Sequence, residues 1–121
     1  FGKPIGKFQA IQHNLSVLAE QVYVARMAAR LACQGPMAAL QPLRVAVAKA
    51  RTSAAADEVT ALAHALHGAM GFTREHHLHH VTRRLWAWRD EFGNETEWQT
   101  RLGRWVTQHG ADQLWPLLTS L

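Results

Sequence analysis

The sequence predicts an all-α domain, an up-down four-helix bundle followed by a short extra C-terminal helix. Apolar residues recur at alternating intervals of three and four over long segments, which is the period of an amphipathic helix. Alternation at every second position, which would indicate a strand, appears nowhere in the 121 residues. Glycine and proline cluster between the periodic segments and divide them into separate helices.

The first helix is expected over residues 8–33, after an opening loop that contains Gly2, Pro4 and Gly6. Its apolar stripe starts with large side chains and ends in alanines, so a partner helix should approach more closely near its end. The stripe consists of Phe8, Ile11, Leu15, Leu18, Val22, Ala25, Ala29 and Ala32. Gly35 can form a left-handed C-cap and Pro36 bars continuation, so the helix should stop there.

The second helix is expected over residues 42–67, with Pro42 in the first turn, where a missing N–H costs nothing. Its alanine-rich stripe favours helix and permits tight antiparallel packing on the first helix. The stripe consists of Val45, Ala48, Thr52, Ala55, Val59, Leu62 and Leu66. Gly68 and Gly71 then predict a turn whose backbone comes close to another helix or a ligand.

A third helix is expected over residues 74–91, with Thr73 as its N-cap and Phe92-Gly93 as its end. Its apolar face would consist of Leu78, Val81, Leu85 and Trp88. Trp86 and Trp88 would lie on opposite faces, so one of them should face a partner subunit or another domain.

The fourth helix should begin after Asn94, because Glu97 follows three residues later in the pattern of a capping box. It carries Trp98 and Trp105 and should end at His109, where Gly110 stops it. The last short helix, over residues 111–118, is expected to be kinked or interrupted at Pro116.

Composition narrows the functional class. Apolar residues make up 48% of the chain, yet no unbroken run is long enough to span a membrane. The net charge is +4 with the basic residues scattered, so neither a nucleic-acid partner nor a membrane is expected. A single cysteine, Cys33, fits a reducing cytoplasm and is expected to be buried at a helix end. Because the chain begins with Phe1 in the middle of a motif, we expect one domain excised from a longer protein.

A histidine cluster offers one alternative chemistry. On a helix, His76 would share a face with His79 or His80, the spacing that a zinc site uses. Glu75 is the one acidic side chain in the neighbouring sequence, so the set of ligands is poor. We therefore expect a solvent-facing or interface segment and no metal.

Four blocks of sequence together resemble the C-terminal helical domain of acyl-CoA dehydrogenases, in the order and at about the spacing of that family. They are Phe1-Gly-Lys-Pro-Ile-Gly-Lys-Phe-Gln-Ala-Ile-Gln12, Ala25-Arg26, Ala48-Lys49 and Leu66-His-Gly-Ala-Met-Gly-Phe-Thr73. The resemblance covers residues 1 to about 93. It implies a flavoprotein that binds FAD and an acyl-CoA thioester and assembles into a homo- or hetero-oligomer.

The resemblance also implies which residues hold the flavin. Phe1 would lie against the cofactor, and Gln9 would hydrogen-bond the ADP half of an FAD bound largely by a neighbouring subunit. The other implied cofactor-binding residues are His67, Gly68, Ala69 and Asn94. Two departures stand out, since relatives usually have glutamine where this chain has Ala65 and a second glycine where it has Ala69.

The largest difference from the family's pattern is at the position of the catalytic base. In the family a glutamate, often within Tyr-Glu-Gly-Thr, removes the α-proton of the thioester while FAD accepts the hydride. Phe92 occupies that position here and cannot accept a proton. Glu91 would point about 100° away if the helix continues, so it could serve only if the backbone shifts. No catalytic residue of the family is therefore intact in this chain.

Two interpretations follow from the missing base. Other family members take their base from a helix that precedes this domain, so the chain can belong to an active enzyme. It can equally belong to an oligomerisation or partner subunit that has lost catalysis. As an isolated piece the domain is expected to be inactive, because most of the acyl site lies elsewhere.

Overall fold

The computed structural model describes residues 2–34 and 40–120. Every regular element within these ranges is helical, which confirms the predicted fold class of four helices and a short C-terminal helix. The α-helices are α1 (Gln9–Cys33), α2 (Gln41–His67), α3 (Leu78–Asp90), α4 (Glu95–His109) and α5 (Leu114–Ser120). Short 3-10 segments lie at Ile5–Lys7, Gly68–Phe72 and Ala111–Gln113.

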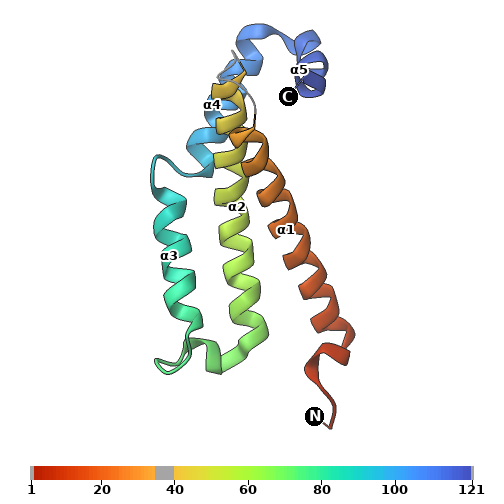
Figure 1. The fold of residues 1–121 in the computed structure, drawn as a ribbon, viewed down its shortest axis with the longest axis vertical. Helices are drawn as coiled ribbons and strands as arrows, with labels where there is room; N and C mark the ends of the chain where they lie inside the picture. Colours follow the sequence, from red (N-terminus) through yellow and green to blue (C-terminus); the bar gives the residue numbers. More distant parts are fainter. Residues whose placement is uncertain (1, 35–39, 121) are drawn as a thin grey trace.

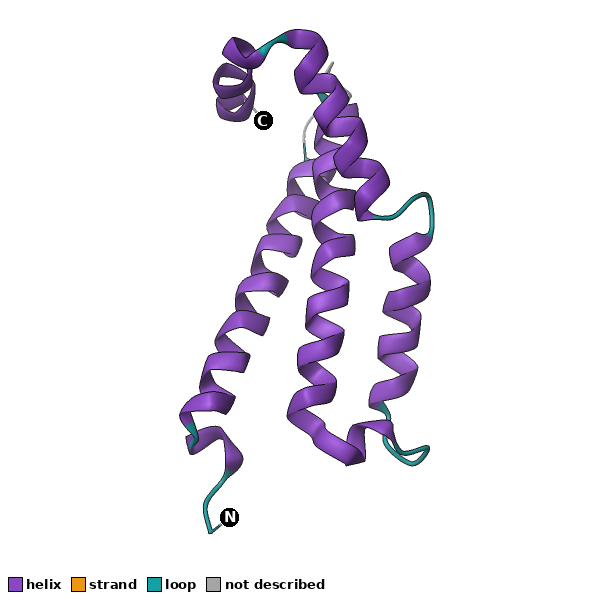
Figure 2. Cartoon of the chain, turned by 180° about the vertical axis from the view of Figure 1, so that it is seen from behind, coloured by secondary structure: helices purple, strands orange, loops and turns teal. Residues whose placement is uncertain are grey.

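Helix α2 is the central element of the fold (Figure 1). Helix α1 lies along one side of it, while α3 and α4 follow each other along its length (Figure 2). Side-chain bonds show that α3 runs antiparallel to α2, since Thr60 bonds to Trp86 and His64, further along α2, bonds to the earlier Thr82. The core is therefore built around one helix that is covered from several directions.

Small side chains make this central position possible. Among the described residues, the buried apolar ones all belong to α2 and are Leu43, Ala46, Ala48, Ala50 and Ala55. The predicted α2 stripe contained Ala48 and Ala55, but its first member, Val45, is 39% exposed. A helix with three neighbours buries more than one stripe, so period alone could not identify all of its core positions.

The face of α1 that meets α2 differs from the predicted stripe. Leu15 and Val22 are 46% and 47% exposed, whereas the polar residues Asn14 and Gln21 are partly covered. The amide oxygen of Gln21 accepts a hydrogen bond from the guanidinium of Arg51 on α2. This polar contact holds Gln21 at the interface, and part of the apolar stripe faces solvent.

The last turn of α1 is more exposed than predicted, and a hydrogen bond holds the loop before its first turn. Cys33, expected to be buried, is exposed, although Gln41 on α2 donates a hydrogen bond to the neighbouring Ala32 O. The predicted stop at Gly35 and Pro36 lies outside the described residues, as does Phe1. At the start, Gln12 Nε2 donates to Gly6 O at 2.9 Å and fastens the opening loop onto the helix.

Helix α3 begins four residues later than predicted. The Thr73 hydroxyl donates to Met70 O at 3.0 Å, so it closes the preceding turn and does not cap α3. The N-cap of α3 is His77, and His76 therefore lies outside the helix. Local hydrogen bonds within residues 68–77 compete with helix here and delay its start.

The boundaries of α4 are confirmed. Asn94 Oδ1 accepts a hydrogen bond from Glu97 N at 3.1 Å, and Gly110 ends the helix with φ +85°. Pro116 does not kink α5, because it stands third in that helix, within the turn whose N–H groups need no helical partner. No helix within the described ranges is both long and apolar enough to cross a membrane.

Candidate functional site

The residues implied as cofactor contacts fall into two groups at opposite ends of α3. His67 ends α2, and Gly68 and Ala69 follow it, at the end of the molecule where α1 also begins (Figure 1). Asn94 lies beyond the other end of α3, whose 13 residues span about 20 Å. The structure therefore places Gln9 and the Gly68 turn at one end of the fold and separates Asn94 from them.

Close packing fixes the shape of the Gly68 turn. Gly71 is buried, and a Cβ added to it would lie 2.9 Å from His67 Cβ and 3.0 Å from a methyl group of Leu78. Real Cβ contacts are almost never that short, so the turn needs glycine at this position. The predicted close backbone approach thus occurs at Gly71, against the protein itself.

His64 on α2 packs against the inner side of the Gly68 turn. It is buried, its Nε2 lies 3.0 Å from the Thr82 hydroxyl on α3, and its ring stacks on Phe72 at 4.5 Å. Trp86 lies on the same aromatic stack, with its ring centroid 6.3 Å from that of His64. These contacts tie the end of α2, the turn and α3 together, so the exposed part of the turn is held on a rigid base.

The exposed side of the turn can receive a ligand. Gly68 has φ +56°, and a Cβ added there would meet nothing within 4 Å. Ala69 and His67 are exposed beside it, and Gln9 is exposed in the first turn of α1. Open space lies beside a glycine whose positive φ disfavours residues with side chains, and polar side chains lie at the same end of the fold; this is compatible with a cofactor edge lying there.

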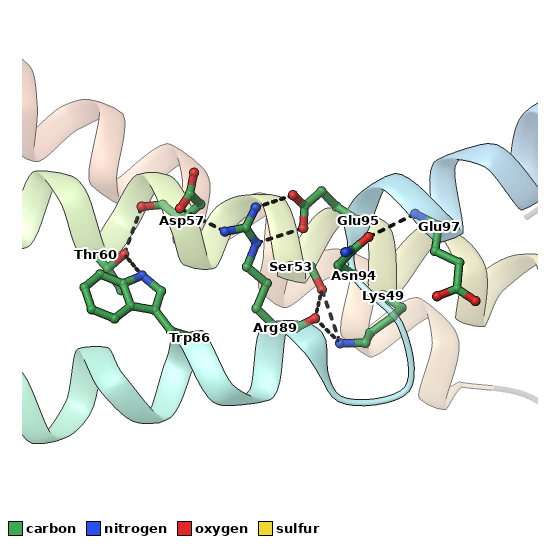
Figure 3. A network of polar contacts seen from close by, with 9 residues as sticks. All are labelled: Lys49, Ser53, Asp57, Thr60, Trp86, Arg89, Asn94, Glu95 and Glu97. Atoms are coloured by element: carbon green, nitrogen blue, oxygen red, sulfur yellow. Dashed lines mark hydrogen bonds and ion pairs between the residues drawn. The ribbon is translucent and has the colours of Figure 1, made fainter.

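The junction between α3 and α4 holds a polar network (Figure 3). The Arg89 guanidinium forms a two-pronged ion pair with the Glu95 carboxylate and contacts Asp57 on α2 at 3.1 Å. Such paired contacts fix direction as well as distance. They hold the start of α4 at a defined angle to the end of α3.

Lys49 completes this network from the side of α2 (Figure 3). Its ammonium group donates to the carbonyl oxygens of Trp88 and Arg89 at 3.0 and 2.9 Å, and to the Ser53 hydroxyl. The last carbonyls of a helix carry partial negative charge and lack helical partners. Lys49 thus caps the C-terminal end of α3.

The segment that the resemblance aligns with the family's glutamate is a turn held by a side-chain hydrogen bond. Phe92 has φ +60°, a conformation that bulky residues rarely adopt, and its side chain is 89% exposed. Its carbonyl accepts a hydrogen bond from Trp98 Nε1 at 3.0 Å, which keeps the turn in place. Helix α3 ends at Asp90, one residue earlier than predicted, and Glu91 is an extended, exposed C-cap residue.

Sequence reasoning missed the network around Arg89. Its members on α2 are Lys49, Ser53, Asp57 and Thr60, at intervals of four, four and three residues. That spacing places a polar stripe along an alanine-rich helix, and it could have indicated that this face of α2 meets polar partners. The partner residues Arg89 and Glu95 could not be identified, because their contacts depend on how α3 and α4 pack on α2.

The histidine cluster does not form the helical pair considered for zinc. Within the described ranges, no three His, Cys, Asp or Glu side chains are grouped so that they could hold a metal ion. His79 and His80 lie with their ring centroids 3.9 Å apart. The proximity of His79, followed by burial, His77 and Arg83, lowers the pKa of His80.

Acid should weaken the α3–α4 junction. The hydrogen bond from Arg89 lowers the pKa of Glu95 to about 2, from 4.5. A carboxylate with a depressed pKa stabilises the fold above its unfolded-state pKa, and this contribution is lost as the pH falls through the folded-state pKa. We expect the melting temperature to fall between about pH 5 and pH 2. Glu95→Gln should melt lower at neutral pH and fall less over that range.

The matched control for this prediction is Glu97→Gln. Glu97 pairs with Arg101 on the exposed face of α4, where ion pairs contribute little. The two variants should therefore differ clearly in thermal melts recorded across the acid range. Identical pH profiles for Glu95→Gln and the unmodified chain would contradict a stabilising role for this ion pair.

Comparison with known proteins adds to these observations. The family described as "Acyl-CoA dehydrogenase, C-terminal domain" matches residues 1–96. A protein of Mycobacterium tuberculosis (strain ATCC 25618 / H37Rv), "Acyl-CoA dehydrogenase IpdE2", is 35% identical over 79 residues. That alignment covers 65% of this chain but 24% of the relative, so the chain spans about a quarter of the relative's length. No solved structure matches significantly.

Proposed function

The chain belongs to the acyl-CoA dehydrogenase family, and on that basis we propose that it is the C-terminal helical-bundle domain of a longer FAD-dependent, cytoplasmic oxidoreductase. The reaction is the α,β-dehydrogenation of an acyl-CoA thioester. FAD, when bound, accepts the hydride from the β-carbon. This domain contributes cofactor contacts and a surface for homo- or hetero-oligomers, and it is inactive by itself.

The exposed Gly68 turn is the observation that supports the cofactor role. Its backbone is open on the outside at Gly68 and packed on the inside at Gly71, so a ligand meets a pre-formed surface. Gln9 and His67 are exposed at the same end of the fold and would supply polar contacts to the cofactor. Asn94, about one helix length away, would meet a different part of an extended cofactor, using the amide nitrogen that capping does not occupy.

A second candidate function rests on Phe92. At the position of the family's base, this chain presents an exposed phenyl ring on a strained and well-supported backbone. A phenyl ring has no atom that can accept a proton at neutral pH, so the Phe92 side chain cannot act as a general base. The alternative is therefore a non-catalytic subunit domain that pairs with an active partner.

Glu91→Gln in the full-length protein tests the assignment of the base. We expect FAD content and the rate of flavin reduction by an acyl-CoA to be retained, because Glu91 is an exposed cap residue. Loss of a positioned general base typically lowers such a rate by about 10²–10⁴-fold. The rate of flavin reduction is measured by stopped flow. Melting temperature and FAD content are measured alongside it as controls for folding and cofactor binding.

Asp90→Asn is the matched control, since it removes an exposed carboxylate one residue away. A drop of the size just given in Glu91→Gln alone would identify Glu91 as the base and overturn our assignment. Retained rate points to a base that lies outside this domain. A full-length protein that retains FAD but is reduced by no acyl-CoA supports the partner-subunit function, whereas failure to retain FAD contradicts the cofactor role.

A further inference from the structure

The Gly68 turn ends in an exposed aromatic ring that lies on a buried histidine. Phe72, the last residue of the 3-10 segment Gly68–Phe72, is 71% exposed, yet its ring stacks on that of His64 with centroids 4.5 Å apart. His64 itself is 8% exposed. The stack therefore holds the outer end of the turn on α2 and covers the histidine.

The hydrogen bonds of His64 define its neutral form. Its Nε2 lies 3.0 Å from the Thr82 hydroxyl, and that hydroxyl donates to His79 O at 3.5 Å. A hydroxyl has one hydrogen to donate, so we assign the ring proton to Nε2, from which it is donated to Thr82 Oγ1. Nδ1 is then an acceptor. It is buried and has no hydrogen-bond partner in the described part of the chain.

A second ring proton is not compatible with this packing. Nδ1 lies 3.4 Å from the position that a Cβ on Gly71 would occupy, so it faces the backbone of the turn. Protonation would turn Nδ1 into a charged donor that is buried without an acceptor. Such a group costs far more free energy than the unpaired acceptor of a neutral ring. Proton uptake therefore favours a conformation in which the ring reaches water.

The groups around His64 do not offset a positive charge on its ring. The titratable residues on the facing sides of α2 and α3 are Asp57, His67, His79, Arg83 and Arg89. Asp57 is the one carboxylate among them, and it lies two turns away, paired with Arg89. No ion pair among the described residues includes His64.

The other neighbouring elements add no partner either. In the loop before α3, His76 lies against His67 with ring centroids 5.0 Å apart, while Arg74 and Glu75 are exposed. The 3-10 segment Gly68–Phe72 has no titratable side chain. Helix α1 diverges from α2 toward this end of the molecule, and its His13 is exposed (Figure 1).

We propose that His64 is a pH-sensitive switch for the Gly68 turn. The neutral ring holds Phe72 and keeps the turn closed, and a proton on Nδ1 releases Phe72 and opens it. Histidine is the side chain whose charge changes between about pH 5 and pH 8. Because the open turn binds one more proton than the closed one, the closed turn loses stability as the pH falls. The consequence rests on the proposed function: in the full-length protein, the opened turn should hold FAD less tightly.

Hydrogen exchange at the turn tests the switch in the chain itself. The reporters are the N–H groups of Gly68 and Thr73, which donate to His64 O and Met70 O. Their protection factors, corrected for the intrinsic effect of pH on exchange, should fall at least about tenfold from about pH 8 to about pH 5, because a buried donor would be left unpaired. Amides of residues 50–56 in the middle of α2 should keep their protection, which separates opening of the turn from unfolding.

Two substitutions assign the effect to one histidine. His64→Gln keeps a donor for Thr82 but takes up no proton, so its protection factors should not depend on pH over this range. His67→Gln is the matched control, because His67 is exposed on the same turn. This variant should keep the full pH dependence. The histidine ring signal that His64→Gln removes from the NMR spectrum should titrate, in the unmodified chain, with the same midpoint as the loss of protection.

Three results would overturn the switch. They are protection that is independent of pH in the unmodified chain, an unchanged pH dependence in His64→Gln, and a ring titration whose midpoint differs from that of the exchange data. The titration of the unmodified chain decides the matter even where glutamine loosens the turn at every pH.

Release of FAD from the full-length protein tests the consequence. The rate of release should be at least about tenfold higher at about pH 5 than at about pH 8, and His64→Gln should lack this dependence. Equal rates at both pH values would overturn the effect of the switch on the cofactor. A full-length protein that retains FAD at no pH contradicts the proposed function, while the exchange data still decide whether the switch exists.

Discussion

Gly93→Ala is expected to destabilise the domain by about 1–3 kcal/mol, the usual cost of forcing a side chain into a sparsely populated backbone conformation. Gly93 has φ +97°, and a Cβ there would lie 2.6 Å from Glu97 Oε2 and 3.2 Å from Trp98 Nε1. The Glu97 carboxylate can move at little cost because it ends a flexible side chain. Trp98 cannot, since its Nε1 bonds to the carbonyl of Phe92. Urea unfolding of the two proteins measures the difference.

Gly103→Ala is the control from the same region. Gly103 lies inside α4, and a Cβ there would meet nothing within 4 Å. Alanine should therefore stabilise the helix by about 0.5–1 kcal/mol, because it restricts the unfolded chain and favours helix. The two substitutions add the same methyl group with opposite expected signs. Equal changes in the free energy of unfolding for the two substitutions would show that position 93 does not require glycine in solution.

Ala55→Leu is the second change with a large expected effect. Ala55 is 3% exposed in the middle of α2, where neighbouring helices leave room for a methyl group. Added methylene groups in a packed core force shifts that typically cost about 1–3 kcal/mol. The measurement is the midpoint of urea unfolding, with an unchanged slope as evidence that the same two states are compared.

The matched control for overpacking is Ala19→Leu on the exposed side of α1. A surface change of this kind should stay within about 0.5 kcal/mol of the unmodified chain. If Ala55→Leu and Ala19→Leu unfold at the same urea concentration, the close approach of helices around the centre of α2 does not persist in solution. The comparison therefore tests the central position of α2 directly.

The α3–α4 junction is held together without the side chain of Phe92, the residue that the resemblance aligns with the family's glutamate. Lys49 and Ser53 bond to the end of α3, and Arg89 joins that end to Glu95 at the start of α4. None of these contacts involves the side chain at position 92. Phenylalanine could therefore occupy this position without loss of the turn, and the phenyl ring was left in solvent.

The sequence by itself determined the helical class and those helix ends that local chemistry controls. Asn94 caps α4 through a bond to a residue three positions away, and Gly110 ends it through its own backbone freedom. Both depend on neighbours in the chain, so the pattern of residues was enough. The family resemblance was likewise carried by linear motifs in residues 1–93 and was confirmed by the match over residues 1–96.

The tertiary structure alone decided which faces are buried and which side chains meet. Gln21 faces α2 and bonds to Arg51, while Leu15 and Val22 of the predicted stripe face solvent. Arg89, Glu95 and Lys49 converge only because α3 and α4 lie in succession along α2. Contacts between residues 6 to 40 positions apart depend on the packing angles of the helices. Helical periodicity determines which residues share a face, but it does not determine which element that face contacts.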